Sequence, residues 1–206
     1  MKKVLTVLMA FFACVIGIYP VIYFIIDRRF GLLASKSDQL LADTLWNICF
    51  YAHIILGGLA LLIGWIQFNQ KIRTQYSAFH RRIGTVYVFS VLLSALAGIG
   101  IGINASGGWI SSLGFICLGV VWFTTTLLAF LSIKNGQIVK HQILMIYSYA
   151  ACFAAVTLRI WLPLLSLYFN DAYLMVAWLC WVPNLIVAYL IIRNMNLQTK
   201  SVITPT

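Results

Sequence analysis

The sequence contains no glutamate and only four acidic residues, and charged residues of both signs make up 9% of its 206 positions. Hydrophobic residues reach 63%. This composition excludes an ordinary soluble domain, in which about a quarter of the residues are charged. Because carboxylates are so scarce, the three histidines, His53, His80 and His141, hold nearly all of the acid–base and metal-binding chemistry that the chain offers.

The five cysteines show no pairing pattern. They are scattered singly through apolar segments, and no Cys-X-X-Cys motif or zinc-type spacing occurs. We therefore interpret them as small core residues. Three histidines without any glutamate also make a compact three-ligand zinc or iron site hard to assemble, so a metal-dependent enzyme is the least favoured interpretation.

Long apolar runs dominate the chain. A helix needs roughly 20 apolar residues to cross the hydrocarbon core of a bilayer. Six runs satisfy this length, and they predict spans at about 4–26, 45–68, 83–103, 110–133, 141–165 and 173–192. We expect the first run to remain as an uncleaved span, because it is longer than the apolar part of a signal peptide. Pro183 predicts a kink in the last span, with Asn184 near mid-depth.

The fold class follows from these runs. We predict an all-α protein in which residues 1–193 form an integral membrane bundle of six transmembrane helices, and residues 194–206 form a polar cytoplasmic tail. The net charge of +10 arises from bases in short loops beside the spans, which is the pattern of membrane topology and anionic headgroup contact. The expected partner is therefore the lipid bilayer, and no nucleic acid is expected.

The distribution of the bases predicts the orientation. Ten lysines and arginines fall at the N-terminus, in the second and fourth loops and in the tail, whereas the other three loops contain only Arg28, Arg29 and Lys36. Cytoplasmic loops carry the excess of basic residues in multi-pass proteins. Both termini are therefore predicted to be cytoplasmic.

His80 and His141 both open spans that rise from the cytoplasmic side, so they are predicted to lie at equal depth. Two imidazoles at one depth on facing helices suit axial ligation of a single haem iron. Gly84, one turn after His80, would leave room for the flat macrocycle, and Arg81 and Arg82 would lie near its propionates. The alternative is that both histidines are interfacial anchors in contact with lipid headgroups.

A second group of residues is predicted in the outer half of the membrane. His53 lies about 12 Å inside the outer boundary, with Gly57 one turn further on, and Arg159 is predicted near the outer end of the fifth span. His53 either serves as a ligand or makes an internal hydrogen bond. Arg159 either reaches toward the headgroups, pairs with Asp43 or Asp171, or binds an anionic ligand from outside.

Three motifs resemble the bacterial predicted-membrane-protein family known as domain of unknown function 2306. They are His-X₃-Gly at 53–57, H-R-R-I-G-T-V-Y at 80–87 and S-Y-A-X₂-F-A-A-V-T-L-R at 148–159. The resemblance covers roughly residues 45–165. It implies a bacterial membrane protein and no established activity.

A more distant resemblance is to cytochrome b561-type proteins, which are six-helix bundles with two haems. That family has one histidine on each of spans 2 to 5, paired between spans 2 and 4 and between spans 3 and 5. This chain has His53, His80 and His141 on spans 2, 3 and 5 and none on span 4. The resemblance therefore implies a single bis-histidine haem b on the cytoplasmic side.

These observations lead to two hypotheses. The first is a haem b-binding electron-transfer protein of the bacterial cytoplasmic (inner) membrane, which exchanges electrons with a quinone or a redox partner. The second is a non-enzymatic small-molecule binder, transporter or assembly subunit, in which the histidines are structural or proton-sensing. A coloured purified protein would distinguish the first from the second.

Overall fold

The computed structural model describes residues 2–26 and 31–203, and it describes side chains for 4–26 and 31–195. Every regular element in these ranges is helical. The α-helices are α1 (Lys2–Ile18), α2 (Ile22–Ile25), α3 (Asp38–Ala42), α4 (Thr44–Gly64), α5 (Gln70–Gln75), α6 (Ser77–Gly102), α7 (Trp109–Lys134), α8 (Ile138–Cys152), α9 (Ala154–Ser166), α10 (Ala172–Leu179) and α11 (Val182–Ile203). The 3₁₀ turns are η1 (Tyr19–Val21), η2 (Gly31–Ser35) and η3 (Trp65–Phe68).

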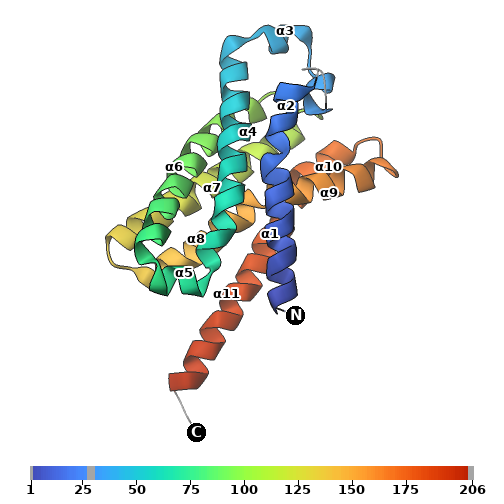
Figure 1. Ribbon diagram of the computed structural model, residues 1–206. Coiled ribbons are helices and arrows are strands. Elements are labelled where there is room, and N and C mark those ends of the chain that lie inside the picture. The colour runs from blue at the N-terminus through green and yellow to red at the C-terminus, as the bar shows by residue number, and fades with distance from the viewer. Residues whose placement is uncertain (1, 27–30, 204–206) are drawn as a thin grey trace.

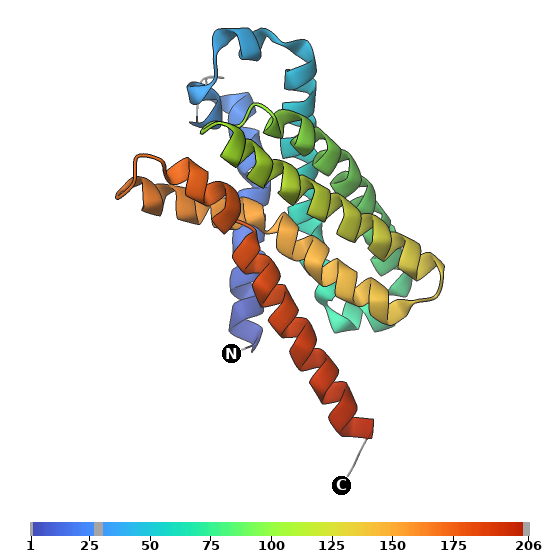
Figure 2. The same cartoon turned by 180° about the vertical axis from the view of Figure 1, so that it is seen from behind.

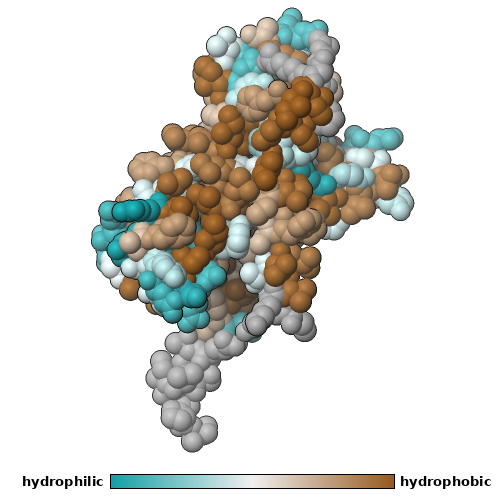
Figure 3. Space-filling view, in the orientation of Figure 1, coloured by the Kyte–Doolittle hydropathy of each residue, from teal (hydrophilic) through white to brown (hydrophobic). Residues whose placement is uncertain are grey.

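Six helical segments of the described chain are long and apolar enough to cross a membrane, which confirms the predicted number of spans. They are Val4–Ile25, Thr44–Phe68, Ser77–Gly102, Trp109–Lys134, Ile138–Ser166 and Ala172–Met195. The third begins earlier than predicted, so that His80 lies inside α6 rather than before it. Hydrophobic side chains cover the middle of the face in Figure 3, and hydrophilic ones gather at its upper end and around α5.

Four helices form the central bundle (Figures 1 and 2). Around it, α4 packs on α6, α6 on α7, α7 on α8, and α8 returns to α4. Consequently α6 and α8 occupy diagonal corners. Their chains run in the same direction, because α7 lies between them as the antiparallel connection.

The ends of the bundle differ in charge. Figure 1 shows both termini, α5 and the α7–α8 turn toward its lower end, and α3 at the opposite end. The exposed bases of the lower end include Lys71, Arg73, Lys134 and Lys140. This grouping matches the charge distribution from which the orientation was inferred. The cytoplasmic assignment of that end stays a prediction.

The first span packs closely on the bundle through glycine. A Cβ atom added at Gly58 of α4 would lie 2.6 Å from the carbonyl oxygen of Gly17 in α1. Real Cβ atoms do not approach that closely, so only glycine permits this helix contact. Ala13, one turn earlier on α1, is fully buried in the same interface.

The fifth and sixth spans are both broken. α8 ends at Cys152 and α9 begins at Ala154, while α10 ends at Leu179 and α11 begins at Val182. The hairpin of α9 and α10 leaves the bundle sideways in both views (Figures 1 and 2). Pro183 stands at the second position of α11, where proline is compatible with a helix start, so the predicted kink in the sixth span is confirmed.

Asn184 joins the two breaks. Its side-chain nitrogen lies 3.2 Å from Ala150 O, 3.0 Å from Cys180 O and 3.1 Å from Thr157 Oγ1. Thr157 Oγ1 also donates to Cys180 O. One amide therefore supplies donors to carbonyls at both interruptions, which is how broken helices are tolerated at membrane depth.

Candidate functional site

A chain of hydrogen bonds crosses the centre of the bundle. Tyr87 of α6 and Ser148 of α8 are joined through their hydroxyls at 2.9 Å, and Ser148 is joined to Thr126 of α7 at 2.7 Å. Thr126 also donates to Trp122 O at 2.7 Å. All three hydroxyl residues are fully buried. This polar layer fixes the relative heights of α6, α7 and α8.

The layer also fixes the relative position of two histidines. His80 precedes Tyr87 by seven residues, and His141 precedes Ser148 by seven residues. Seven residues are close to two helical turns, so each histidine lies on the same face as its bonded partner, about 10.5 Å nearer the lower end. His80 and His141 are close enough to interact electrostatically. The equal depth predicted from the sequence is thereby supported by the register of the bundle.

The ring nitrogens of the two histidines are in different states. His141 Nδ1 lies 2.9 Å from Ala129 O, and a carbonyl can only accept, so Nδ1 carries the proton and the lone pair is on Nε2. A histidine that ligates a metal is commonly oriented in this way through its other nitrogen. His80 Nδ1 is buried and has no hydrogen-bond partner among the described residues.

Gln67 is a site residue that sequence reasoning missed. It is only 7% exposed, and neither atom of its amide has a hydrogen-bond partner in the described chain. Its Oε1 lies 3.6 Å from where a Cβ at Gly84 would stand, one turn above His80. A buried amide with no partner costs free energy and calls for a ligand or a water molecule. A glutamine inside an apolar run was the only available sequence signal.

These residues are the ones that a haem between α6 and α8 would contact, and haem binding itself stays a prediction. The donor set contains one imidazole whose Nε2 is available and a second whose Nδ1 is buried without a partner. No backbone or rigid side chain crowds Gly84, since an added Cβ there would meet only Gln67 Oε1 at ordinary contact distance. Arg81 and Arg82 are exposed at the same end, and Arg81 interacts electrostatically with His80.

His53 makes an internal hydrogen bond, as the second sequence-based alternative proposed. Its Nδ1 donates to Ser94 O at 2.9 Å, and Ser94 Oγ donates to His53 O at 2.9 Å. The imidazole packs against Gly98, where an added Cβ would lie 2.8 Å from Nδ1. Gly57 faces Ser94 Oγ and Trp122, so it allows α4 and α6 to approach. These contacts lock α4 against α6.

Arg159 of α9 is half-buried. Its guanidinium carbon lies 4.3 Å from the centre of the Tyr19 ring, and Nη1 donates to Ala155 O at 2.8 Å. No described acidic residue forms an ion pair with it. Asp43, one of the predicted partners, instead accepts a hydrogen bond from Trp46 N at the start of α4. Arg159 and His53 are within electrostatic range of each other, and the outer site stays a prediction.

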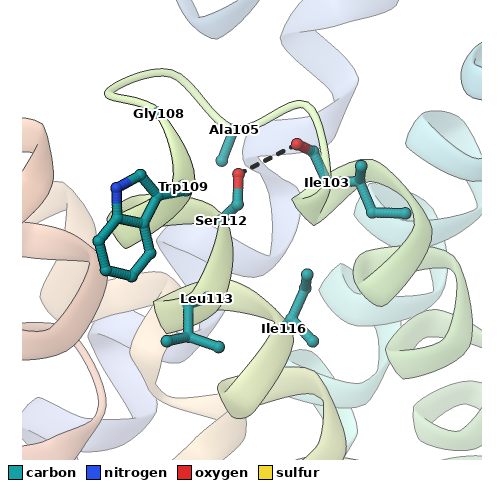
Figure 4. Close-up of a pocket in the computed structure, with 7 residues that line it drawn as sticks. All are labelled: Ile103, Ala105, Gly108, Trp109, Ser112, Leu113 and Ile116. Atoms are coloured by element: carbon teal, nitrogen blue, oxygen red, sulfur yellow. Dashed lines mark hydrogen bonds between the residues drawn. The ribbon is translucent and has the colours of Figure 1, made fainter.

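Figure 4 shows an open hollow of about 440 Å³ near the turn between α6 and α7. Ser112 Oγ donates to Ile103 O at its edge, and Trp109 stands at its rim. Its lining contains no titratable side chain, so it offers little chemistry. Within the described ranges, no three His, Cys, Asp or Glu side chains are grouped so as to hold a metal ion.

Comparison with known proteins gives one family. Residues 50–192 match the model of the family DUF2306, which is described as a predicted membrane protein. Neither the curated proteins nor the solved structures include a match to this chain. The family description supports the membrane fold, and the likeness to cytochrome b561 is not among the findings.

Proposed function

Since the chain belongs to the DUF2306 family of predicted membrane proteins, whose description names no activity, we propose a function from its own residues. The protein is a multi-pass membrane protein that holds one haem b between α6 and α8 and passes electrons within the bacterial cytoplasmic membrane. His80 and His141 would hold it through their imidazole nitrogens. A quinone or a protein redox partner supplies or removes the electron.

One observation carries this proposal. The hydrogen bond between Tyr87 and Ser148 supports a register of α6 and α8 in which residues seven positions earlier, His80 and His141, lie at one depth and within electrostatic range of each other. His141 Nδ1 also donates to Ala129 O of α7, a contact within the bundle that headgroup anchoring does not require. The orphaned Nδ1 of His80 adds support, because a buried ring nitrogen without a partner is costly unless something binds there.

The surrounding residues have separate roles in this proposal. Ala129 O orients His141 by accepting from Nδ1, and this hydrogen bond raises the basicity of Nε2. Arg81 and Arg82 would neutralise the haem propionates. The Tyr87–Ser148 layer closes the upper side and excludes water. Haem, when bound, supplies a one-electron couple whose potential the protein sets through its ligands and their hydrogen bonds.

Haem content measured on four proteins tests the assignment. Wild type, His80→Ala, His141→Ala and His53→Ala are purified from cells supplied with a haem precursor, and haem is quantified per chain. We expect about one haem per chain in wild type and His53→Ala, with loss in the other two. Full haem occupancy in His80→Ala and His141→Ala, or none in wild type, contradicts the proposal.

The paired helix breaks favour a second candidate. Interrupted helices in the two last spans are a recurring feature of transporters, in which such ends form a binding site near mid-membrane. A small-molecule binder or transporter would therefore also fit α8–α9 and α10–α11. This candidate predicts a colourless protein whose stability responds to its ligand.

A further inference from the structure

Four segments meet around Arg159 in the upper half of the molecule. Arg159 comes from α9, Tyr19 from η1, Tyr23 from α2 and His53 from α4. The Arg159 guanidinium lies over the Tyr19 ring, the Tyr19 and Tyr23 rings are in contact with their centroids 6.0 Å apart, and His53 is within electrostatic range. α9 packs directly on α1, the helix that leads into η1. Figure 1 shows the α9–α10 hairpin below α2 and beside α1. The cluster is distinct from the His80–His141 end.

The charge of Arg159 is not balanced by the described chain. A guanidinium remains protonated in proteins and offers five N–H donors. Only Nη1 is in a hydrogen bond, and its acceptor is the carbonyl of Ala155 on the same helix. No acidic side chain in residues 4–26 or 31–195 forms an ion pair with it. Ionisable groups inside membrane spans are rare and usually mark binding sites.

The aromatic groups beside Arg159 supply further polar atoms. The Tyr19 and Tyr23 hydroxyls lie 3.5 Å and 3.3 Å from a Cβ built at Gly31, so both point toward the outer loop. The Tyr19 ring holds the guanidinium from one face at 4.3 Å. Among the described residues no acceptor engages the other guanidinium nitrogens, and a guanidinium binds carboxylate or phosphate through a planar pair of such donors.

We propose that Arg159, together with Tyr19 and Tyr23, binds the oxyanion of a carboxylate or phosphate group in the outer half of the membrane. Where the anion is the headgroup of an amphiphile, its apolar chain lies on the hydrophobic surface to which the exposed side chains Phe24 and Ile160, next to Tyr23 and Arg159 in sequence, contribute. The anion is either the headgroup of an amphiphile or a free ion. This site does not depend on haem at the opposite end.

Ligand-dependent stability of the purified full chain tests the proposal. The probes are phosphatidylglycerol, lauric acid, inorganic phosphate and, as a neutral control lipid, phosphatidylcholine. We expect an anionic probe to raise the melting temperature of wild type and to persist as an adduct in native mass spectrometry. Stabilisation by the lipid or lauric acid alone identifies an amphiphile, whereas stabilisation by phosphate alone identifies a free anion. No response to any anionic probe overturns the proposal.

Variants locate the site. Arg159→Gln is expected to weaken binding of the stabilising anion at least tenfold. Arg159→Lys should weaken this binding less, because lysine keeps the charge but loses the bidentate pair of donors. Arg193→Gln, at an exposed arginine of α11, is the matched control and should bind as wild type. Equal weakening in Arg193→Gln shows a nonspecific charge effect and overturns the site. If Arg159→Gln does not fold, Arg159→Lys and the wild-type response still decide the outcome.

Discussion

Tyr87 and Ser148 are hydrogen-bonded across the diagonal of the bundle, and each follows a histidine by seven residues. This single bond therefore relates the inner ends of α6 and α8. It connects packing to the candidate site, since any shift of one helix along the other separates His80 from His141 in depth.

Replacement of Tyr87 by phenylalanine removes the phenolic hydroxyl and keeps the ring. Interhelical hydrogen bonds in membrane proteins contribute about 0.6 kcal/mol on average, so we expect a loss of roughly 0.5–1.5 kcal/mol in unfolding free energy. Denaturant unfolding in mixed detergent micelles measures it. Tyr189→Phe, at an exposed tyrosine of α11, is the control. Equal stability of Tyr87→Phe and wild type would show that the layer does not set the register.

Gly98 is expected to be intolerant of alanine. Its added Cβ would lie 2.8 Å from His53 Nδ1, and the ring is held by its hydrogen bond to Ser94 O. Overpacking of this kind costs about 1–3 kcal/mol. Gly100→Ala is the matched control on the same helix, because its Cβ would meet only Cys49 Sγ at 3.8 Å. Thermal unfolding of the two variants should therefore differ, and similar melting temperatures would contradict the contact.

Asn184→Ala tests the link between the two broken spans. The substitution leaves carbonyls at both interruptions without their donor, which costs about 1–3 kcal/mol. Hydrogen exchange should rise in α9 and α10 before it rises in the bundle, because the hairpin is held to the rest of the chain at this point. Asn194→Ala, on an exposed position of the same helix, is the control. Uniform exchange in both variants would rule out the link.

Lys36 lies outside the spans and joins the segment before α3 to the turn between α6 and α7. Its Nζ donates to Asn104 O at 2.6 Å and to Ser106 Oγ at 3.1 Å, and partial burial lowers the pKa of its ammonium group. The unfolded chain therefore holds this proton more tightly, so stability should rise with pH between the lowered pKa and the ordinary lysine value of about 10.4. Nuclear magnetic resonance of ¹³C-methylated lysines, assigned with Lys36→Met, measures the titration. A pKa at or above the ordinary value contradicts the burial.

The sequence was sufficient to predict the six membrane spans but not all of the helix breaks within them. Long apolar runs determine where helices can cross a membrane, and Pro183 marked the interruption between α10 and α11. The break at Phe153 has no such signal, because residues 148–158 contain neither proline nor glycine. It is stabilised by Asn184, which reaches Ala150 O from another helix, and a single-sequence pattern does not report a contact of that kind.

The same distinction applies to the candidate site. Equal depth of His80 and His141 followed from topology, because both residues lie near the start of helices that run in one direction. The burial of Gln67 and the hydrogen bond of His53 to Ser94 O depend on which helix faces pack against each other in the bundle. Largely apolar residues surround His53 and Ser94 on every side of their helices, so hydrophobic periodicity contained little information about their orientation.

The central claim is that His80 and His141 ligate one haem iron. Electron paramagnetic resonance of the oxidised, haem-supplied protein tests it most directly, because two imidazole ligands give a low-spin ferric signal that a single ligand does not. We predict a low-spin signal in wild type that persists in His53→Ala and is lost in His80→Ala and in His141→Ala. A protein that takes up no haem, or a low-spin signal unchanged in both of those variants, would contradict the account.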